Sequence, residues 1–160
     1  MEPRFEMTNE MKIVGIKLCM SVASNKTFML WNTFMPRRRE IRNNIGNDLY
    51  SMQVYGHSYF DVYNPDSLFD KWAGIQVTDF DAVPDSMETY IIPKGLYAVF
   101  IHKGPASEGA RTFQYIFGTW LPNSGYVVDD RPHFEILGGK YKNDSPDSEE
   151  EVWVPVKLKV

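Results

Sequence analysis

Residues 95–121, GLYAVFIHKGPASEGARTFQYIFGTWL, carry a strand signal followed at once by a helix signal. Residues 95–103 are rich in apolar and aromatic side chains, which favours a strand. In residues 106–121 the apolar side chains recur at spacings of three and four, which predicts an amphipathic helix. These side chains are Phe113, Ile116, Phe117, Trp120 and Leu121. Pro122 then predicts the end of the helix, because it cannot donate a backbone hydrogen bond.

The first half of the chain repeats this order of signals. Residues 11–22 favour a strand, and residues 25–35 again carry apolar side chains at helical spacing. Pro36 ends or kinks this helix, or starts a second short helix that closes at Gly46. At one common offset Pro36 aligns with Pro122, which indicates an internal repeat. Two further strands are expected in each half, at 50–55 and 71–78 in the first and at 133–137 and 152–160 in the second.

These elements predict an α+β fold. A unit with one helix on three strands covers only one face of its sheet, so two such units can share a core. We therefore expect two strand–helix–strand–strand repeats, related by a pseudo-twofold axis around a central ligand groove. The expected domain spans residues 1–160, with a first half at about 11–78, a polar connector at about 79–90 and a second half at about 91–160.

Composition and charge exclude several classes of protein. With 43% hydrophobic and 24% charged residues, the chain of 160 residues is neither disordered nor fibrous. The net charge of −4 argues against a domain that coats nucleic acid, and we expect the basic run 37–39 to be a solvated helix face without direct nucleic-acid contacts. Cys19 is the single cysteine, so no disulfide can form within the chain. Since neither a secretory signal nor a membrane span is visible, we expect a soluble, cytoplasmic protein without a membrane partner.

Residues that could hold a metal or a cofactor are dispersed along the chain. His57, His102 and His133 lack the close helical spacing of a zinc hydrolase, and a single cysteine cannot build a thiolate site. The pair Gly138-Gly139 lacks the rest of a nucleotide-binding motif, and no serine lies in a nucleophile elbow. We therefore expect no metal and no cofactor.

Glu135 is the residue that we expect to carry the chemistry of the protein. It lies in the short apolar segment HFEIL, where alternation places it on one face with His133 and Leu137. This pattern alone also fits an exposed strand position. Among aromatic rings, however, a carboxylate can neutralise a cationic ligand, or its pKa can rise so that it acts as a general acid or base.

Aromatic residues are frequent, since four Trp, nine Tyr and ten Phe make up 14% of the chain. Most aromatic side chains fill cores, but a surplus also suits the walls of an apolar ligand pocket. Trp120 and Tyr126 flank the end of the second helix and suit a pocket rim, with core packing as the alternative. Gln53 is expected to occupy, in the first half, the position that Glu135 has in the second. Weaker candidates for ligand binding, for which core packing is again the alternative, are Tyr97, Tyr115, Trp72 and Trp31.

Several segments of the chain resemble a known family. IPKGLYAVFIHKGP, TWLPNSGY, DDRPHFEILGG and EVWVPVKL are similar to the second half of the GyrI-like small-molecule-binding domain, also called the AraC-type effector-binding domain. FMLWNTFMPRRREIRN and KWAGIQV are similar to the corresponding helix and strand of its first half. The resemblance runs from about Met11 to Val160. It implies a pseudo-twofold α+β fold with a small-molecule pocket between the halves, and it places the glutamate that matches Glu135 at the pocket floor.

The resemblance implies a domain that captures lipophilic ligands, cationic ones included. Because only about ten residues precede the first expected strand, we expect a stand-alone domain without a fused DNA reader. Two alternatives stay open. Some stand-alone members of the family hydrolyse reactive small molecules, for which Glu135 would be the catalytic residue. Others restrain DNA gyrase, so the chain can instead be an interaction protein for gyrase or for a transcription regulator.

Overall fold

Nine strands form an antiparallel sheet in the computed structural model, which describes all 160 residues. The strands are β1 (Arg4–Thr8), β2 (Met11–Ser21), β3 (Leu49–Val54), β4 (Leu68–Val77), β5 (Glu88–Ile92), β6 (Gly95–Lys103), β7 (Tyr126–Val128), β8 (His133–Leu137) and β9 (Glu149–Leu158). Their order across the sheet is β1-β6-β9-β8-β3-β4-β2-β5, and β7 pairs with β9 outside this path.

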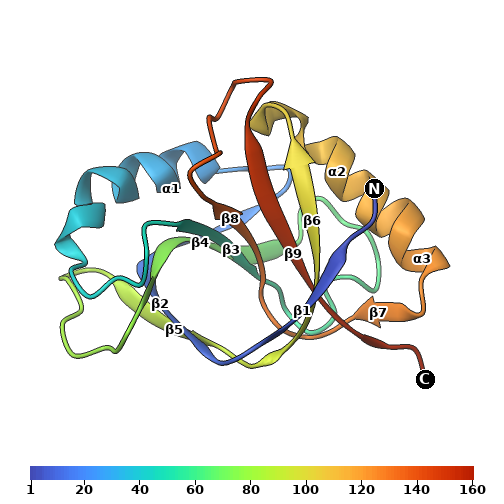
Figure 1. The fold of residues 1–160 in the computed structure, drawn as a ribbon, viewed down its shortest axis with the longest axis horizontal. Coiled ribbons are helices and arrows are strands. Elements are labelled where there is room, and N and C mark those ends of the chain that lie inside the picture. Colours follow the sequence, from blue (N-terminus) through green and yellow to red (C-terminus); the bar gives the residue numbers. More distant parts are fainter.

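Two helical segments lie on the same side of the sheet, well apart from each other (Figure 1). The first consists of α1 (Thr27–Phe34) and the 3-10 helix η1 (Met35–Glu40). The second consists of the 3-10 turn η2 (Ala106–Glu108), α2 (Gly109–Tyr115), the π-helical turn η3 (Ile116–Trp120) and α3 (Leu121–Asn123). None of these helices has both the length and the apolar character that crossing a membrane requires.

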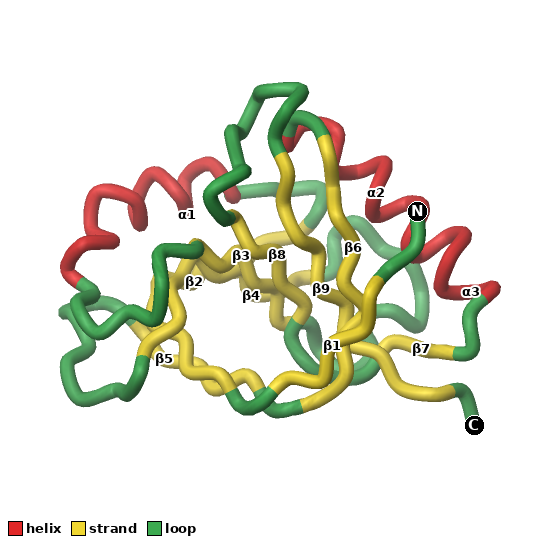
Figure 2. Tube along the Cα trace, viewed as in Figure 1, coloured by secondary structure: helices red, strands yellow, loops and turns green.

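The chain itself joins the two ends of the sheet. β1 lies at one end of the strand order, yet only Asn9 and Glu10 separate it from β2 near the other end. Pro93 and Lys94 link β5 to β6 in the same way. Because β1 pairs with β6 while β2 pairs with β5, the sheet curls around one interior, as the strands in Figure 2 show.

Side-chain alternation along the curled strands separates three hydrophobic clusters. The interior cluster consists of Ile13, Tyr50, Met52, Trp72, Ile92, Tyr97, Val99 and Phe134. The α1 cluster joins Leu30 and Phe34 of the helix to residues of β2 and β4 such as Ala73. The α2 cluster joins Ile116 of η3 to residues of β6 and β9 such as Val152. The two helical segments therefore cover two separate parts of the outer face of the sheet.

The element order strand, helix, strand, strand occurs as β2-α1-β3-β4, and it occurs again as β6-α2-β8-β9 with the short strand β7 added before β8. In the first unit β4 pairs with β2 and β3, and in the second unit β9 pairs with β6 and β8. β3 and β8 pair with each other in the middle of the sheet. The expected α+β fold is confirmed, whereas the superposition of the two halves by a rotation stays a prediction.

Six of the nine strands lie where the sequence predicts them. β6 and β8, for example, occupy the predicted residues 95–103 and 133–137. β1 (RFEMT) and β5 (ETYII) are not predicted, because charged and polar residues interrupt their apolar pattern. β5 begins at Glu88, so it takes the last residues of the segment expected as a connector.

The helix that follows Pro36 is shorter than predicted. η1 ends at Glu40, and the next residue, Ile41, is extended and buried. Beyond it, the amide of Thr78 donates to the carbonyl of Asn43 at 3.1 Å, and the amide of Ile45 donates to the carbonyl of Gln76 at 2.8 Å. The prediction of a helix up to Gly46 is wrong because these groups bond to the end of β4 instead.

Candidate functional site

A stripe of buried polar side chains runs along the two central strands, between the α1 and α2 clusters. In the register of β3 and β8, Ser51 lies opposite Glu135 and Gln53 lies opposite His133. Each of these four side chains is buried. Their neighbours in sequence, such as Met52 and Phe134, point into the interior cluster, so the polar stripe faces the helix side of the sheet.

The stripe ends on both sides where a helix begins to cover the sheet. Next to Ser51, β4 places Ala73 in the α1 cluster, and next to Glu135, β9 places Val152 in the α2 cluster. Lys71 of β4 lies opposite Gln53 and extends the polar stripe by one strand. The polar residues therefore lie on the strip of sheet between the two helical segments, where we look for the floor of the expected groove.

Glu135 lies in the middle of this floor with one oxygen unpartnered. The residue is 7% exposed. The side-chain amide of Gln53 donates a hydrogen bond to its Oε1 atom at 3.2 Å. Its Oε2 atom is buried and has no hydrogen-bond partner. Because buried polar atoms in folded proteins are almost always paired, this oxygen is suited to meet a ligand group.

Burial raises the pKa of Glu135 to about 7. The nearby charge of Lys71 and the hydrogen bond from Gln53 act in the opposite direction, and the charge of Glu150 on β9 adds to the rise. At neutral pH the protonated and ionised forms of the carboxyl are therefore present in similar amounts.

Aromatic rings cover the floor beside Glu135. Tyr55, the first residue after β3, packs edge-on against His133 with ring centroids 4.9 Å apart. Phe60, from the β3–β4 loop (residues 55–67), lies over His133 at 5.3 Å and over Phe117 at 5.8 Å, with its ring nearly parallel to both. Phe117 belongs to the π-helical turn η3, a type of turn that is frequent at functional sites.

The ionisable groups of this aromatic cover are held neutral. Burial, with a smaller contribution from Arg131, lowers the pKa of His133 to about 3. Burial and the charge of Glu135 raise the pKa of Tyr55. Glu135 is therefore the group of the buried cluster that changes its charge near neutral pH.

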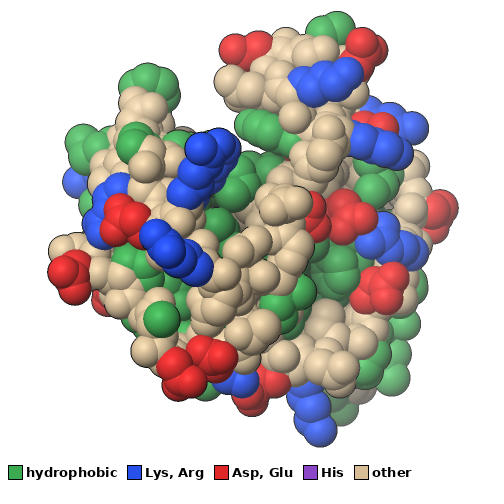
Figure 3. Space-filling model, turned by 60° about the vertical axis from the view of Figure 1, so that its left-hand side comes forward, with side chains coloured by type: hydrophobic (Ala, Val, Ile, Leu, Met, Phe, Trp, Pro, Cys, Tyr) green, Lys and Arg blue, Asp and Glu red, His purple; other side chains and the backbone are tan.

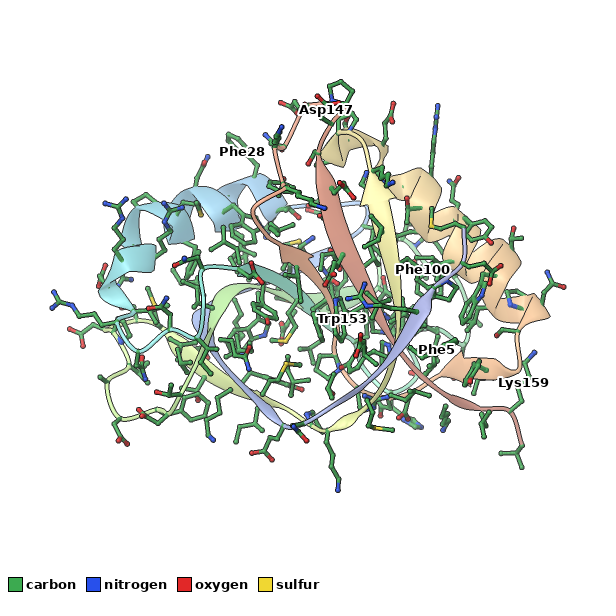
Figure 4. All side chains as sticks on the ribbon, in the orientation of Figure 1. Phe5, Phe28, Phe100, Asp147, Trp153 and Lys159 are labelled. Atoms are coloured by element: carbon green, nitrogen blue, oxygen red, sulfur yellow. The ribbon has the colours of Figure 1, made fainter.

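Two of the residues predicted as ligand contacts, Gln53 and Glu135, lie in direct contact. Trp120 and Tyr126 are found on the same side of the sheet, but in a second aromatic cluster with Phe5 and Phe100. The rings of Trp120 and Tyr126 are 6.3 Å apart and nearly parallel. Figure 4 shows Phe5 and Phe100 on the side of α2 and α3, so this cluster lies beneath the end of the second helical segment.

The other predicted contacts lie elsewhere. Trp72 and Tyr97 belong to the interior cluster, on the opposite face of the sheet from Glu135. The hydroxyl of Tyr97 donates to the carbonyl of Pro132 at 2.8 Å. The hydroxyl of Tyr115 donates to the carbonyl of Met1 at 2.8 Å. Trp31 packs edge-on against Phe34 beside the α1 cluster.

The sequence offered a signal for some of the rings that were missed. Tyr55 continues the alternation of Ser51 and Gln53, and His133 shares the face of Glu135. Phe60 lies in a loop without periodicity, so its place could not be found in this way. Lys71 was also missed, because its position depends on the register of β3 and β4.

The surface near the site is hollowed. Figure 3 shows a hollow beside the β8–β9 loop (residues 138–148), with hydrophobic side chains exposed in it. Phe28 of α1 and Asp147 of that loop both lie at the top of the molecule in Figure 4. Phe28 is 82% exposed, although it belongs to a helix that borders the groove. No group of three or more His, Cys, Asp or Glu side chains is placed to hold a metal ion.

Two curated proteins are similar to this chain. It is 28% identical to the transcriptional regulator BrlR of Pseudomonas aeruginosa over 145 residues, which are 90% of this chain and 51% of that protein. It is 34% identical to a DNA gyrase inhibitor of Erwinia billingiae over 85 residues, which are 49% of this chain and 52% of that protein. The chain thus spans about half the length of the curated relatives it matches.

A solved structure has the same fold. The structure of SAV2435 bound to tetraphenylphosphonium superposes with a TM-score of 0.76 at 14% identity, over 98% of this chain and 94% of that one. The sequence model of a family described as the GyrI-like small molecule binding domain matches residues 1–157. Since this match covers nearly the whole sequence, the chain belongs to the GyrI-like family.

Proposed function

We propose that this protein binds a lipophilic cation in the groove between α1 and α2, with Glu135 as the counter-charge. The observation that carries the proposal is the unpartnered Oε2 atom of Glu135, which is buried on the groove floor. The aromatic rings of Tyr55 and Phe117, which both pack against His133 beside it, supply faces on which a cationic or aromatic ligand can lie.

The energetics of the carboxyl support a cationic ligand. A buried carboxylate without a cation or several donors is unstable, which is why the pKa of Glu135 rises to about 7. A ligand cation next to the Oε2 atom would stabilise the ionised form and restore the lost interaction. A neutral ligand would gain the contacts with the rings but not this charge interaction.

The comparisons support the same class of ligand. The family is described as a small molecule binding domain, and the structural neighbour SAV2435 was solved with tetraphenylphosphonium, a lipophilic cation. We therefore use tetraphenylphosphonium as the first probe for this chain.

We also propose that the groove lies on a pseudo-twofold axis between β3 and β8, which relates residues 11–78 to residues 91–160 within one domain. The equal pairing inside the two units, and the direct pairing of β3 with β8, support this arrangement. An experimental structure tests it: after superposition of the two halves, α1 should fall on the helical segment that contains α2. Helices that do not overlap would contradict it.

The function is tested with Glu135→Gln, which keeps the shape of the side chain and removes its charge. The variant should bind tetraphenylphosphonium on the order of tenfold more weakly, which is about 1.4 kcal/mol. Its affinity for tetraphenylmethane, a neutral compound of the same shape, should change little. Glu88→Gln, at an exposed carboxylate of β5, is the matched control. Equal losses for the cation and the neutral compound would contradict the proposal.

A second candidate function is hydrolysis of a reactive lipophilic compound. The observation that favours it is again Glu135, because a carboxyl with a pKa of about 7 and a free oxygen can act as a general base on water. Incubation of the protein with an aryl ester separates the two functions. An enzyme would release the phenol, and Glu135→Gln would abolish the release, whereas a binding protein would return the ester unchanged.

A further inference from the structure

Phe60, a loop residue, packs against three aromatic rings near Glu135. Its ring lies nearly parallel to those of Phe117 and His133, at interplanar angles of 15° and 27°. Tyr55 meets it edge-on, with the centroids 4.9 Å apart. Together, Phe117, His133 and Tyr55 form a shelf for one flat ring, which we call the ring shelf.

The ring shelf and the residue on it differ in how firmly they are held. His133 begins β8 and Phe117 lies in the helical segment, so both are held by regular backbone structure, and Tyr55 is the first residue after β3. Phe60 is 45% exposed, and its neighbours Val62 and Tyr63 are exposed as well.

Apart from the aromatic contacts of Tyr55, Tyr59 and Phe60, few contacts tie the β3–β4 loop to the rest of the protein. His57 and Asp130 form one exposed ion pair at 3.2 Å, and the amide of Ala23 donates to the carbonyl of Pro65 at 2.9 Å. The other backbone hydrogen bonds of the loop are local, such as that from Tyr59 to Gly56. An exposed ion pair contributes little to stability, so the loop belongs to the segments that open most easily.

The ring shelf lies next to the charge that we assign to the ligand site. His133 and Glu135 share one face of β8, two residues apart, and Tyr55 is close enough for the charge of Glu135 to affect it. A ligand ring in the place of Phe60 would therefore carry an attached cation to the Oε2 atom of Glu135. Tyr59 of the same loop, whose ring lies 4.4 Å from that of Tyr55, would leave together with Phe60.

We propose that the ring shelf is a subsite for a flat aromatic ring of the ligand, that Phe60 fills it in the free protein, and that residues 56–67 of the β3–β4 loop withdraw when the ligand binds. This inference rests on the proposed function and narrows it to ligands in which a flat aromatic ring is joined to a cationic centre. The loop is thus an intramolecular competitor. The apparent affinity equals the intrinsic affinity multiplied by the fraction of molecules in which the loop is open.

The test compares Phe60→Ala with Tyr63→Ala, a matched control in the same loop, whose residue is 83% exposed. Both variants and the unaltered protein are titrated with N-methylacridinium, a flat aromatic cation whose fluorescence reports binding. Because half of the ring of Phe60 is buried, its removal should raise the affinity roughly fivefold and speed association, while Tyr63→Ala changes neither. Unchanged or weaker binding by Phe60→Ala would overturn the proposal.

Dodecyltrimethylammonium, a lipophilic cation without a ring, tests the ring shelf itself. We expect Phe60→Ala to improve its binding less than that of N-methylacridinium, because an alkyl chain does not stack on the shelf. An equal gain for the two cations would show that Phe60 blocks the groove without marking a ring subsite, and it would overturn this part of the proposal.

A measurement without ligand keeps this test separate from that of the proposed function. The pKa of Glu135, followed by carboxyl carbon NMR, should fall in Phe60→Ala from about 7 toward the ordinary ~4.3, because water reaches the uncovered shelf. An unchanged pKa would overturn the loop's role even if cations bind. Conversely, a lower pKa without binding of any cation would show that Phe60 shields Glu135 from water, and it would contradict the proposed function.

Discussion

The two faces of the central strands β3 and β8 differ in polarity, although alternate residues of the same two strands form them. One face points into the interior cluster and is apolar, with Tyr50, Met52 and Phe134. The other face, between the helices, is polar, with Ser51, Gln53, His133 and Glu135. The interior face is closely packed and stabilises the fold, whereas the helix face keeps a buried oxygen without a partner. The difference supports the proposal that the second face binds a ligand.

The largest effect is expected on the interior face. Phe134→Ala removes a fully buried ring that packs against Tyr97 at 5.1 Å and Trp153 at 5.2 Å. It should lower the free energy of unfolding by about 3–5 kcal/mol, as measured by chemical denaturation. Ser51→Ala, on the helix face of the paired strand, is the control and should lower it by less than about 1 kcal/mol. Similar losses in the two variants would remove the distinction between the faces.

The next effect is a gain in the free energy of unfolding, which is expected at high pH when Glu135 is replaced by Gln. Since the pKa of Glu135 rises from 4.5 to about 7 on folding, the folded protein holds its proton more tightly than the unfolded chain. The stability from this group is complete below pH 4.5 and is lost as the pH rises through 7. Each pKa unit is worth about 1.4 kcal/mol, so the loss is about 3 kcal/mol.

Comparison with Glu135→Gln isolates this loss. Between pH 4 and pH 8, the free energy of unfolding of Glu135→Gln should rise by about 3 kcal/mol relative to that of the unaltered protein. His133, whose pKa of about 3 lies below its ordinary value, gives stability that is lost as the pH falls from 6.5 to 3. It is present in both proteins, so its contribution cancels in the difference. A difference that does not change with pH would mean that water reaches the carboxyl.

A smaller effect is expected from Gln53→Ala, which removes the one hydrogen bond to Glu135. That bond favours the ionised form, so its loss should raise the pKa of Glu135 further above 7. The free energy of unfolding at pH 8 should fall by about 1 kcal/mol. NMR titration of the carboxyl measures the first effect and denaturation the second. A lower pKa in the variant would show that Gln53 does not act through this bond.

The smallest effect separates the two aromatic clusters on the helix side. Phe117→Ala should weaken the binding of tetraphenylphosphonium by about 0.5–1 kcal/mol, because one ring face beside Glu135 is lost. Tyr126→Ala removes a ring from the cluster around Trp120 and Phe5, and it should leave the affinity unchanged. Calorimetric titration of both variants with tetraphenylphosphonium measures the two affinities. The reverse order would place the ligand under α3, as the sequence alone suggests.

The main elements of the fold could be read from the sequence, because they depend on local patterns, whereas the burial of Glu135 was implied only by the resemblance to the family. The strand alternation of HFEIL and the repeated order of elements place Glu135 and Gln53 on the same face. Trp72 and Tyr97 could not be assigned in this way. Both faces of the sheet are covered, so burial does not reveal which face an aromatic residue takes.

The covering rings depend on contacts between distant parts of the chain. Phe60 and Phe117 come from a loop and a helical turn that meet over β8. The spacing of residues within either segment does not indicate this contact. The short strands β1 and β5 are likewise stabilised by partners far away in sequence, β6 and β2. Their own residues are too polar to indicate a strand.

The central claim is that the ionised form of Glu135 binds the cation, and the pH dependence of affinity tests it most directly. Tetraphenylphosphonium keeps its charge at every pH, and His133 stays neutral above its pKa of about 3. The charged groups that remain nearby are Lys71 and Glu150, so Glu150→Gln serves as the control.

With a pKa of about 7 for Glu135, the affinity for tetraphenylphosphonium should fall as the pH drops below 7 and reach, near pH 5, about a tenth of its value at pH 8, which is the affinity expected of Glu135→Gln. It should level off above pH 8, and Glu150→Gln should show the same profile. In Glu135→Gln the affinity should be weak and independent of pH. An unaltered protein that binds equally well at pH 5 and pH 8, or a Glu135→Gln variant that keeps the pH dependence, would contradict the role of Glu135.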